Sequence, residues 1–324
     1  MKISCTMFKE SSESKSPDNI YAILGIFIGV FFLSAFAESV IPTMMMMPTL
    51  IERLQAEGFK GRITINSGYL NRVMELSKEI MSQPRYFSVI LICNIFMILI
   101  AVIYCRYVEK RPLTSMGFRK KKSARHYLAG VFTGIFMMTA DVLLSVVCGV
   151  HEIKLSAERD TVLLIVYFIG FLIQGAAEEV IFRGYLMNTI GGKVSPVPAI
   201  LISSAIFSIA HAANKGFGFL AFFNIVLFGV FEGLHMILYD DIWGACAIHS
   251  MWNFFQGNFY GISVSGTDVA DSVFVLTRTS DSSILTGGDF GIEGSIFTTL
   301  ILLLASACLI IGISKKNQRT NLKS

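Results

Sequence analysis

Ionisable residues stand in the middle of a long apolar stretch of the sequence, at positions where they could do chemistry. The segment Gln174–Leu186 contains Glu178, Glu179 and Arg183. Because residues four apart share one face of a helix, we expect Glu179 and Arg183 to form an ion pair that neutralises two charges. Glu178 points about 100° away from Glu179 and is left without a local partner. The small residues around Gly175 allow another helix to approach this face closely.

Two later apolar stretches carry residue pairs with the same four-residue spacing. Phe207 and His211 share one predicted helix face, and His249 and Asn253 share another. Each pair could simply serve helix packing, because polar side chains in hydrocarbon need hydrogen-bond partners. Together with Glu178, however, the three stretches could place a carboxylate, two imidazoles and an amide in the common interior of a helix bundle.

A predicted turn over Gly191–Ser195 relates the first two of these stretches. Glu178 and His211 lie on opposite sides of this turn, each roughly 20–25 Å away along a helix. An antiparallel hairpin would therefore bring the carboxylate and the imidazole to the same depth in a membrane.

A carboxylate and two imidazoles can do two kinds of chemistry. The carboxylate can act as a general base toward water, helped by apolar surroundings. The same three groups can also bind zinc. Asn253 is a poor zinc ligand but a good donor to a developing oxyanion, and the chain lacks the HExxH helix motif of common zinc proteases. The residues thus favour a metal-free hydrolytic site without a cofactor, and zinc is the alternative.

The composition indicates that the elements holding these residues cross a membrane. Hydrophobic residues make up 53% of the 324 residues and charged residues only 15%, whereas soluble domains carry roughly 25% charged residues. A helix needs about 20 apolar residues to span the hydrocarbon layer. We predict an all-α polytopic membrane protein with about eight such helices, the fifth and seventh being short: Tyr21–Ile41, Phe87–Tyr107, Tyr127–Val150, Val162–Ile190, Pro196–Ala213, Phe217–Tyr239, Ile242–Gly257 and Ser295–Ile313.

Basic residues predict how the chain is oriented. Arg106–Arg125, between the second and third stretches, is the densest basic segment, and the tail after Ile313 is also basic. The positive-inside rule places both in the cytoplasm, with both termini. One tension is the basic loop Pro42–Arg85, which would then lie outside; its part Ile51–Ile80 could be a helix along the headgroups. A net charge of +4 is too small to indicate nucleic-acid binding.

The predicted sixth helix carries two further polar residues. Glu232 and His235 are three apart and hence neighbours on one helix face. We expect them to line the same polar intramembrane cavity as a local pair, and a role in gating or proton transfer is the alternative.

The three spaced motifs resemble those of the CAAX protease and bacteriocin-processing enzyme family (CPBP, or Abi), which consists of intramembrane proteases. EExxxR matches Glu178-Glu179-Val-Ile-Phe-Arg183, FxxxH matches Phe207-Ser-Ile-Ala-His211, and HxxxN matches His249-Ser-Met-Trp-Asn253. The resemblance covers about Val162–Gly257. It implies a glutamate-dependent endopeptidase with about eight transmembrane helices, located in the cell membrane of a bacterium.

The resemblance also implies a role for each matched residue. Glu178 would activate the attacking water with help from His211, whereas His249 and Asn253 would stabilise the oxyanion. Glu179 and Arg183, together with Phe207 of the second motif, would support the shape of the site. The expected partners are membrane lipids and a peptide or lipidated protein substrate, because eukaryotic members trim residues after a prenylated cysteine.

The motifs divide the chain into three parts and leave two alternatives open. Residues 1–160 would form N-terminal helices with the basic loop, residues 161–257 the catalytic core, and residues 258–324 an outside loop, a last helix and a basic tail. The alternatives are a non-catalytic immunity or regulatory protein on the same fold, and a zinc-dependent form of the protease.

Overall fold

Long apolar segments of the chain form helices that run side by side. The computed structural model describes residues 5–59 and 67–321. Apart from one short hairpin, the regular elements in this part are helical, as predicted. The α-helices are α1 (Thr6–Ser12), α2 (Ile20–Ala56), α3 (Ser67–Met81), α4 (Pro84–Cys93), α5 (Ile95–Ile103), α6 (Ser123–Val147), α7 (Thr161–Glu179), α8 (Asn188–Lys193), α9 (Pro196–Ala210), α10 (Phe219–Tyr239), α11 (Trp243–Phe254), α12 (Ser283–Thr286) and α13 (Ile296–Asn321).

Short helical pieces of other types and one hairpin complete the described fold. The π-helical segments are η1 (Tyr104–Val108), η3 (Val180–Met187) and η4 (Phe255–Phe259), and the 3₁₀ segments are η2 (Leu113–Met116), η5 (Gly288–Phe290) and η6 (Ile292–Gly294). Strands β1 (His151–Leu155) and β2 (Phe274–Arg278) pair antiparallel, with His151 opposite Arg278.

Six helices among the described residues are long and apolar enough to cross a membrane. They confirm the prediction of an all-α polytopic membrane protein. The fifth and seventh predicted spans correspond to α9 and α11, which have only 15 and 12 residues. Both pack inside the bundle, α9 against α10 and α11 against α6 and α7. Neighbouring helices rather than lipid therefore cover much of their surface.

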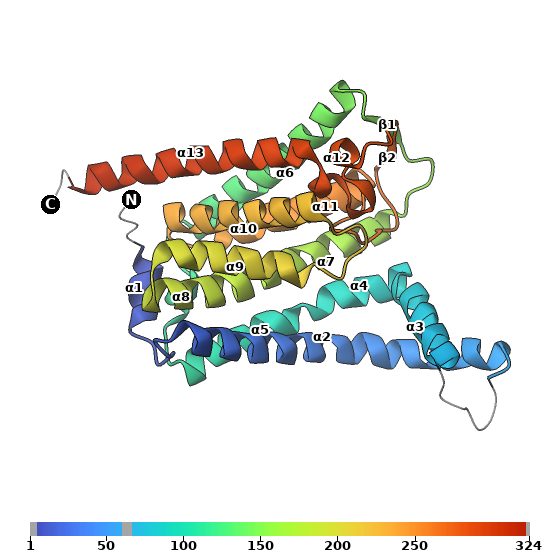
Figure 1. The fold of residues 1–324 in the computed structure, drawn as a ribbon, viewed down its shortest axis with the longest axis horizontal. Helices are drawn as coiled ribbons and strands as arrows, with labels where there is room; N and C mark the ends of the chain where they lie inside the picture. The colour runs from blue at the N-terminus through green and yellow to red at the C-terminus, as the bar shows by residue number, and fades with distance from the viewer. Residues whose placement is uncertain (1–4, 60–66, 322–324) are drawn as a thin grey trace.

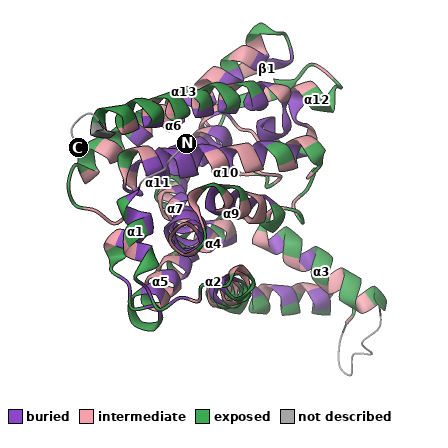
Figure 2. Cartoon of the chain, turned by 60° about the vertical axis from the view of Figure 1, so that its left-hand side comes forward, coloured by how far each residue is buried: buried purple, intermediate pink, exposed green. Residues whose placement is uncertain are grey.

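The helices lie in layers, with α10 and α11 near the centre (Figure 1). Helices α2, α4 and α5 form one side, and α13 lies on the opposite side. The apolar window of α10 is 67% buried inside the protein, against 22% for α2, and Figure 2 shows this contrast in colour. Both ends of the described chain lie at one end of the bundle, and the β1–β2 hairpin lies at the other. The two described ends therefore lie on one side of the bundle.

The N-terminal region differs from the prediction, because α2 does not end near Ile41. It continues through Pro42 and Pro48 to Ala56. Instead of one surface helix over Ile51–Ile80, its end packs against α3, and residues 60–66 of that range lie outside the described residues. The reason is a small apolar cluster between α2, α3 and the start of α4, made of Met46, Leu50, Leu54, Leu76, Ile80 and Tyr86.

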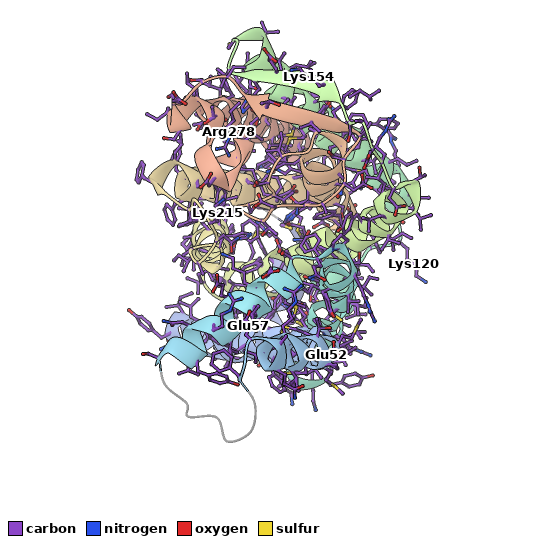
Figure 3. The ribbon with its side chains drawn as sticks, turned by 90° about the vertical axis from the view of Figure 1, so that its right-hand side faces the viewer. Glu52, Glu57, Lys120, Lys154, Lys215 and Arg278 are labelled. Carbon is purple, nitrogen blue, oxygen red and sulfur yellow. The ribbon has the colours of Figure 1, made fainter. Side chains whose placement is uncertain are left out.

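Two basic residues of this region, Arg53 and Arg72, form ion pairs with acids of α3 or at the end of α2. Arg53 lies 2.6 Å from Glu79, and Arg72 pairs with Glu57 and lies 2.8 Å from Glu75. Figure 3 shows Glu52 and Glu57 at this end, away from Lys154 and Arg278 near the hairpin. These acids offset basic charge in the predicted outside loop.

Close helix contacts fix α11 against its neighbours. A Cβ added at Gly130 of α6 would lie 2.4 Å from the carbonyl oxygen of Gly244, and one at Gly175 of α7 would lie 2.6 Å from the Ser250 nitrogen. Small residues at such crossings let helix backbones approach closely in membranes. They place α11 between α6 and α7, next to the acidic end of α7.

Candidate functional site

A cavity of about 290 Å³ opens between α2, α4, α7, α9, α10 and α11. The four residues expected to do chemistry, Glu178, His211, His249 and Asn253, all line it, together with Phe207. All three predicted parts of the chain contribute to its wall, so the site is not confined to residues 161–257. The other lining residues are Glu38, Phe87, Ile90, Leu91, Asn94, Phe171, Gln174, Asn214, Ile225, Phe228, Val264, Ser265, Thr267 and Glu293.

Glu178 lies in the last turn of α7 and accepts a hydrogen bond from a described residue through only one of its two carboxylate oxygens. Its Oε1 accepts a 2.7 Å hydrogen bond from Nε2 of Gln174. Its Oε2 lies 3.4 Å from Nε2 of His249 and has no hydrogen-bond partner among the described residues. The side chain is 18% exposed. The carboxylate is thus oriented through one oxygen, while the other is enclosed beside the imidazole of His249.

Glu179 and Arg183 form the ion pair that their spacing predicts. Nη1 of Arg183 lies 2.9 Å from Oε1 of Glu179, and both side chains are fully buried. The guanidinium carbon of Arg183 lies 4.2 Å from the centre of the Phe207 ring, an attractive cation–π geometry. Phe207 thereby connects the first and second motifs.

His249 lies between the two glutamates. Its Nδ1 is 2.8 Å from Oε1 of Glu179, and its Nε2 faces Glu178. A carboxylate that accepts a hydrogen bond from one ring nitrogen fixes the orientation of a histidine. The rings of Phe228 and Phe207 stand edge-on to the imidazole, with centroids 5.1 and 5.9 Å away. His249 is therefore held on four sides and has little rotational freedom.

His211 follows the last residue of α9 and is half-buried. Its Nδ1 lies 2.9 Å from the carbonyl oxygen of Phe207. Because a carbonyl can only accept, Nδ1 carries the hydrogen, and in the neutral ring Nε2 is left as an acceptor. His211 can thus accept a hydrogen bond from a water molecule or a substrate group.

Gln174, which sequence reasoning did not select, connects two of the selected residues. It accepts a 2.9 Å hydrogen bond from Nδ2 of Asn253 through its own Oε1, while its Nε2 donates to Glu178. The available signal was its position four residues before Glu178 on one helix face. The Asn253 amide keeps a second hydrogen for the cavity.

Glu293 is a second residue that the sequence did not reveal, because it lies in the polar segment after α11. Its Oε2 accepts hydrogen bonds from the Ser265 backbone nitrogen at 2.7 Å and from Nε2 of Gln256 at 3.1 Å. Its Oε1 accepts from Nε1 of Trp252 at 3.1 Å. Glu293 thus ties the connecting segments to α11 at the edge of the cavity.

Glu232 and His235 do not line this cavity, contrary to expectation. Both are buried on α10, and neither carboxylate oxygen of Glu232 has a hydrogen-bond partner among the described residues. His235 instead packs on Tyr239, with ring centroids 4.5 Å apart, and against Gly244. Their face of α10 points to the packed interior rather than to the cavity.

No three His, Cys, Asp or Glu side chains come together to hold a metal ion in residues 5–59 and 67–321. Within the cavity, both nitrogens of His249 face glutamate oxygens, and Nδ1 of His211 faces a backbone carbonyl. The groups are thus arranged for hydrogen bonding and proton transfer.

One comparison with known proteins covers the segment that carries the site. Residues 160–255 match the family model described as type II CAAX prenyl endopeptidase Rce1-like. Comparisons with curated proteins and with solved structures gave no match. The matched segment agrees with the range expected from the three motifs and contains Glu178, His211, His249 and Asn253. Residues 160–255 are thus similar to the type II CAAX prenyl endopeptidases, and this match supports the resemblance to the CAAX protease family.

Proposed function

We propose that the protein is an intramembrane endopeptidase in which Glu178 activates water. The observation that supports this most is the unequal environment of the two Glu178 oxygens. Gln174 donates to Oε1, while Oε2 has no hydrogen-bond partner among the described residues and lies 3.4 Å from Nε2 of His249, in a side chain that lines the cavity. A carboxylate held in this way can accept a proton from water without losing its orientation.

The proposed reaction assigns a proton path to Glu178. The carboxylate takes a proton from water, and the water oxygen attacks the scissile carbonyl carbon. The proton then passes to the leaving nitrogen as the carbon–nitrogen bond breaks, so that a carboxylic acid and an amine are released. Nε2 of His211 accepts a hydrogen bond from the water and orients it.

The oxyanion of the tetrahedral intermediate needs donors that are already in place. In the proposed mechanism these are the free amide hydrogen of Asn253 and, when protonated, Nε2 of His249. Donors fixed before the reaction cost little reorganisation when charge develops. Gln174 fixes Asn253, and Glu179 with two aromatic rings fixes His249.

The proposed substrate is a prenylated peptide or protein that reaches the site from the membrane. The family description supports this class, and the apolar side chains of α4 and α10 on the cavity wall can contact apolar substrate groups. The proposed location is a bacterial cell membrane with both termini in the cytoplasm, supported by the basic segment at the end of the bundle where both described ends lie.

Cleavage of a fluorogenic peptide with a farnesylated CAAX sequence tests this function. Purified parent protein should cleave it, and Glu178→Gln should lose roughly a hundredfold or more of the rate. Glu52→Gln is the matched control, because Glu52 is an exposed carboxylate on α2 outside the cavity. Cleavage by Glu178→Gln at the parent rate would overturn the role of Glu178, whereas a folded parent protein that cleaves no peptide would indicate a non-catalytic regulatory or immunity role.

The zinc-dependent alternative has a separate test. Elemental analysis of the purified protein and cleavage in a strong chelator would show whether a bound metal is needed. A stoichiometric zinc ion that is essential for cleavage would replace the glutamate-activated water by a metal-bound one.

A further inference from the structure

A second carboxylate, Glu38, lines the cavity and has no part in the mechanism above. It comes from the middle of α2, in the helix layer that faces α7 across the cavity. It is half-buried, and its Oε1 is fully enclosed without a hydrogen-bond partner among the described residues. A carboxylate in such a place is costly unless a cation or a proton neutralises it.

The other carboxylates of the cavity have partners that Glu38 lacks. Glu293 accepts hydrogen bonds from Trp252, Gln256 and Ser265, and Glu178 accepts one from Gln174. Glu38 is close enough to Glu178 for the two charges to repel each other. Among the described lining residues there is no lysine or arginine, so the protein itself does not supply a cation at the cavity.

We propose that Glu38 is a specificity-determining residue that binds a cationic side chain of the peptide substrate. This inference rests on the proposed function, because it places the substrate in the same cavity. A lysine or arginine near the scissile bond would pair with Glu38 and remove its repulsion with Glu178. The ion pair would form in a partly desolvated site, where charge pairing discriminates more strongly than it does in water.

A charge-swap experiment tests this assignment. Farnesylated CAAX peptides would carry Lys, Gln or Glu at one position at a time near the prenylated cysteine. The parent should cleave the Lys peptide at the recognised position roughly tenfold faster than the Glu peptide. Glu38→Gln should bring the rates of the Lys and Gln peptides close together, and Glu38→Lys should reverse the preference toward the Glu peptide.

Two outcomes would overturn the role of Glu38. One is a parent enzyme with no charge preference at any position, and the other is Glu38→Lys with the preference of the parent. Loss of cleavage of all peptides alike in Glu38→Gln would also contradict a specificity role. If the parent cleaves no peptide, or Glu178→Gln cleaves as well as the parent, the proposed function itself fails. Glu52→Gln, on the same helix but outside the cavity, should keep the parent preference.

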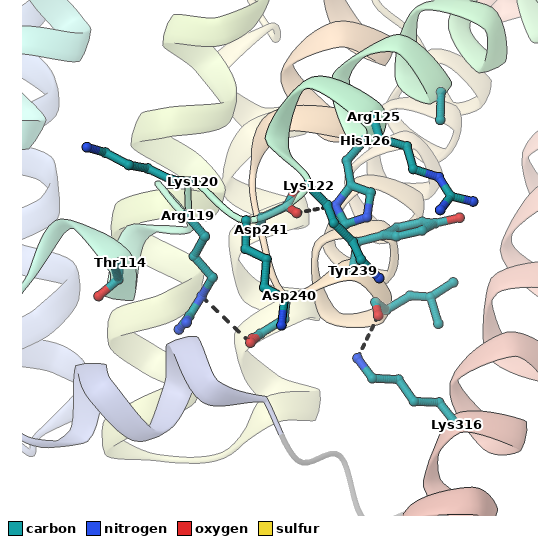
Figure 4. A pocket seen from close by; sticks show the side chains of 13 residues that line it. Thr114, Arg119, Lys120, Lys122, Arg125, His126, Tyr239, Asp240, Asp241 and Lys316 are labelled. Atoms are coloured by element: carbon teal, nitrogen blue, oxygen red, sulfur yellow. Dashed lines mark hydrogen bonds and ion pairs between the residues drawn. The ribbon is translucent and has the colours of Figure 1, made fainter.

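A second inference concerns a basic pocket at the end of the bundle where the first and last described residues of the chain lie. A pocket of about 760 Å³ is lined by six lysine and arginine residues against two aspartates. Figure 4 shows how these side chains surround it. The cations come from the segment before α6, from the start of α6 and from the end of α13: Arg119, Lys120, Lys121, Lys122, Arg125 and Lys316.

The two aspartates of this pocket are already engaged. Asp240 accepts hydrogen bonds from the backbone nitrogens of Thr6 and Met7, and Asp241 pairs with His126. Lys120, Lys121, Lys122 and Arg125 form no ion pair with any described residue. Arg119 by contrast pairs with Glu10 and Asp240. Four of the six cations of the pocket therefore have no acidic partner among the described residues.

We propose that this pocket binds the phosphate of an anionic phospholipid headgroup. The pocket lies where the spanning helices α6, α10 and α13 begin or end, which is the depth of the headgroups in a membrane. Lysine and arginine are the usual partners of phosphate oxygens.

Native mass spectrometry with defined lipids tests the lipid site. The parent should retain dihexanoyl phosphatidylglycerol several-fold better than dihexanoyl phosphatidylcholine, and the double variant Lys122→Gln/Arg125→Gln should lose this preference. Lys154→Gln is the matched control, because Lys154 is an exposed lysine of β1, in the hairpin at the opposite end of the bundle (Figure 1). An unchanged preference in the double variant would overturn the site. If millimolar inorganic phosphate displaced the lipid completely, the pocket would be a site for free phosphate and not for a lipid headgroup.

Discussion

Nδ1 of His249 lies 2.8 Å from Oε1 of Glu179, the oxygen that Nη1 of Arg183 also contacts at 2.9 Å. The buried carboxylate of Glu179 thus connects Arg183, which lies in η3 directly after α7, to His249 of α11. The second glutamate of the motif contacts two buried side chains, whereas the first lines the cavity. The two adjacent glutamates should therefore respond differently to the same substitution.

Glu179→Gln should lower both stability and activity. The substitution leaves the buried Arg183 without a counter-charge, which costs about 3–5 kcal/mol for a broken buried pair, and it weakens the hold on His249. Thermal unfolding of purified protein, measured beside peptide cleavage, checks this. Glu178→Gln is the comparison, because it should lose activity with little loss of stability. An unfolding temperature of Glu179→Gln equal to that of the parent would contradict the structural role of the pair.

Gln174→Leu should lower kcat roughly tenfold, with a smaller change in KM. Leucine fills a similar volume but removes both the donor to Glu178 and the acceptor for Asn253. Gln174→Glu offers a second measurement, since it keeps an acceptor for Asn253 but places a like charge beside Glu178. A parental kcat for Gln174→Leu would show that Gln174 does not position the carboxylate.

Gly175→Ala should destabilise the protein by about 1–3 kcal/mol. The new Cβ would lie 2.6 Å from the backbone nitrogen of Ser250, so α11 has to move away from α7. The matched controls are Gly25→Ala and Gly29→Ala on α2, where nothing lies within 4 Å of the added atom. Their unfolding temperatures should not fall. Cleavage by Gly175→Ala should also drop, because a shift of α11 displaces His249 and Asn253.

The β1–β2 hairpin should become less stable as the pH falls. Burial, and secondly the charge of Arg278, lower the pKa of His151. A histidine with a folded-state pKa below its unfolded value of about 6.5 binds more protons when unfolded. Its contribution is therefore fully present above that value and is lost as the pH falls toward the folded-state pKa. Hydrogen exchange of the hairpin amides at pH 7 and pH 5 measures this. His151→Gln, which does not titrate, should show a smaller change between the two pH values.

Much of the site could be predicted from short-range spacing. The four-residue steps in Glu179–Arg183 and His249–Asn253 depend only on helix geometry, and the turn after α8 brings Glu178 and His211 to one cavity. The residues that were missed depend on contacts between distant segments. Glu293 reaches the cavity edge through loop contacts with Ser265, and Glu38 faces it from α2, which no local pattern can reveal.

The fold was predictable where apolar length alone decides it. The length of an apolar run does not predict where a helix ends when the residues beyond that run pack against another helix. Helix α2 extends to Ala56 because α3 folds back onto it and covers Leu50 and Leu54. Helices α9 and α11 are shorter than predicted because the chain changes direction at His211 and changes helix type after Phe254.

The placement of Arg183 one helical turn after Glu179 also matters while the protein is being made. The two charges can neutralise each other as soon as that segment coils, before any later helix has left the ribosome. A nascent segment with a self-compensated pair enters lipid at a lower cost than one with an isolated charge. Glu232 has no such neighbour on α10, so that segment should depend on earlier ones to be accepted by the insertion machinery.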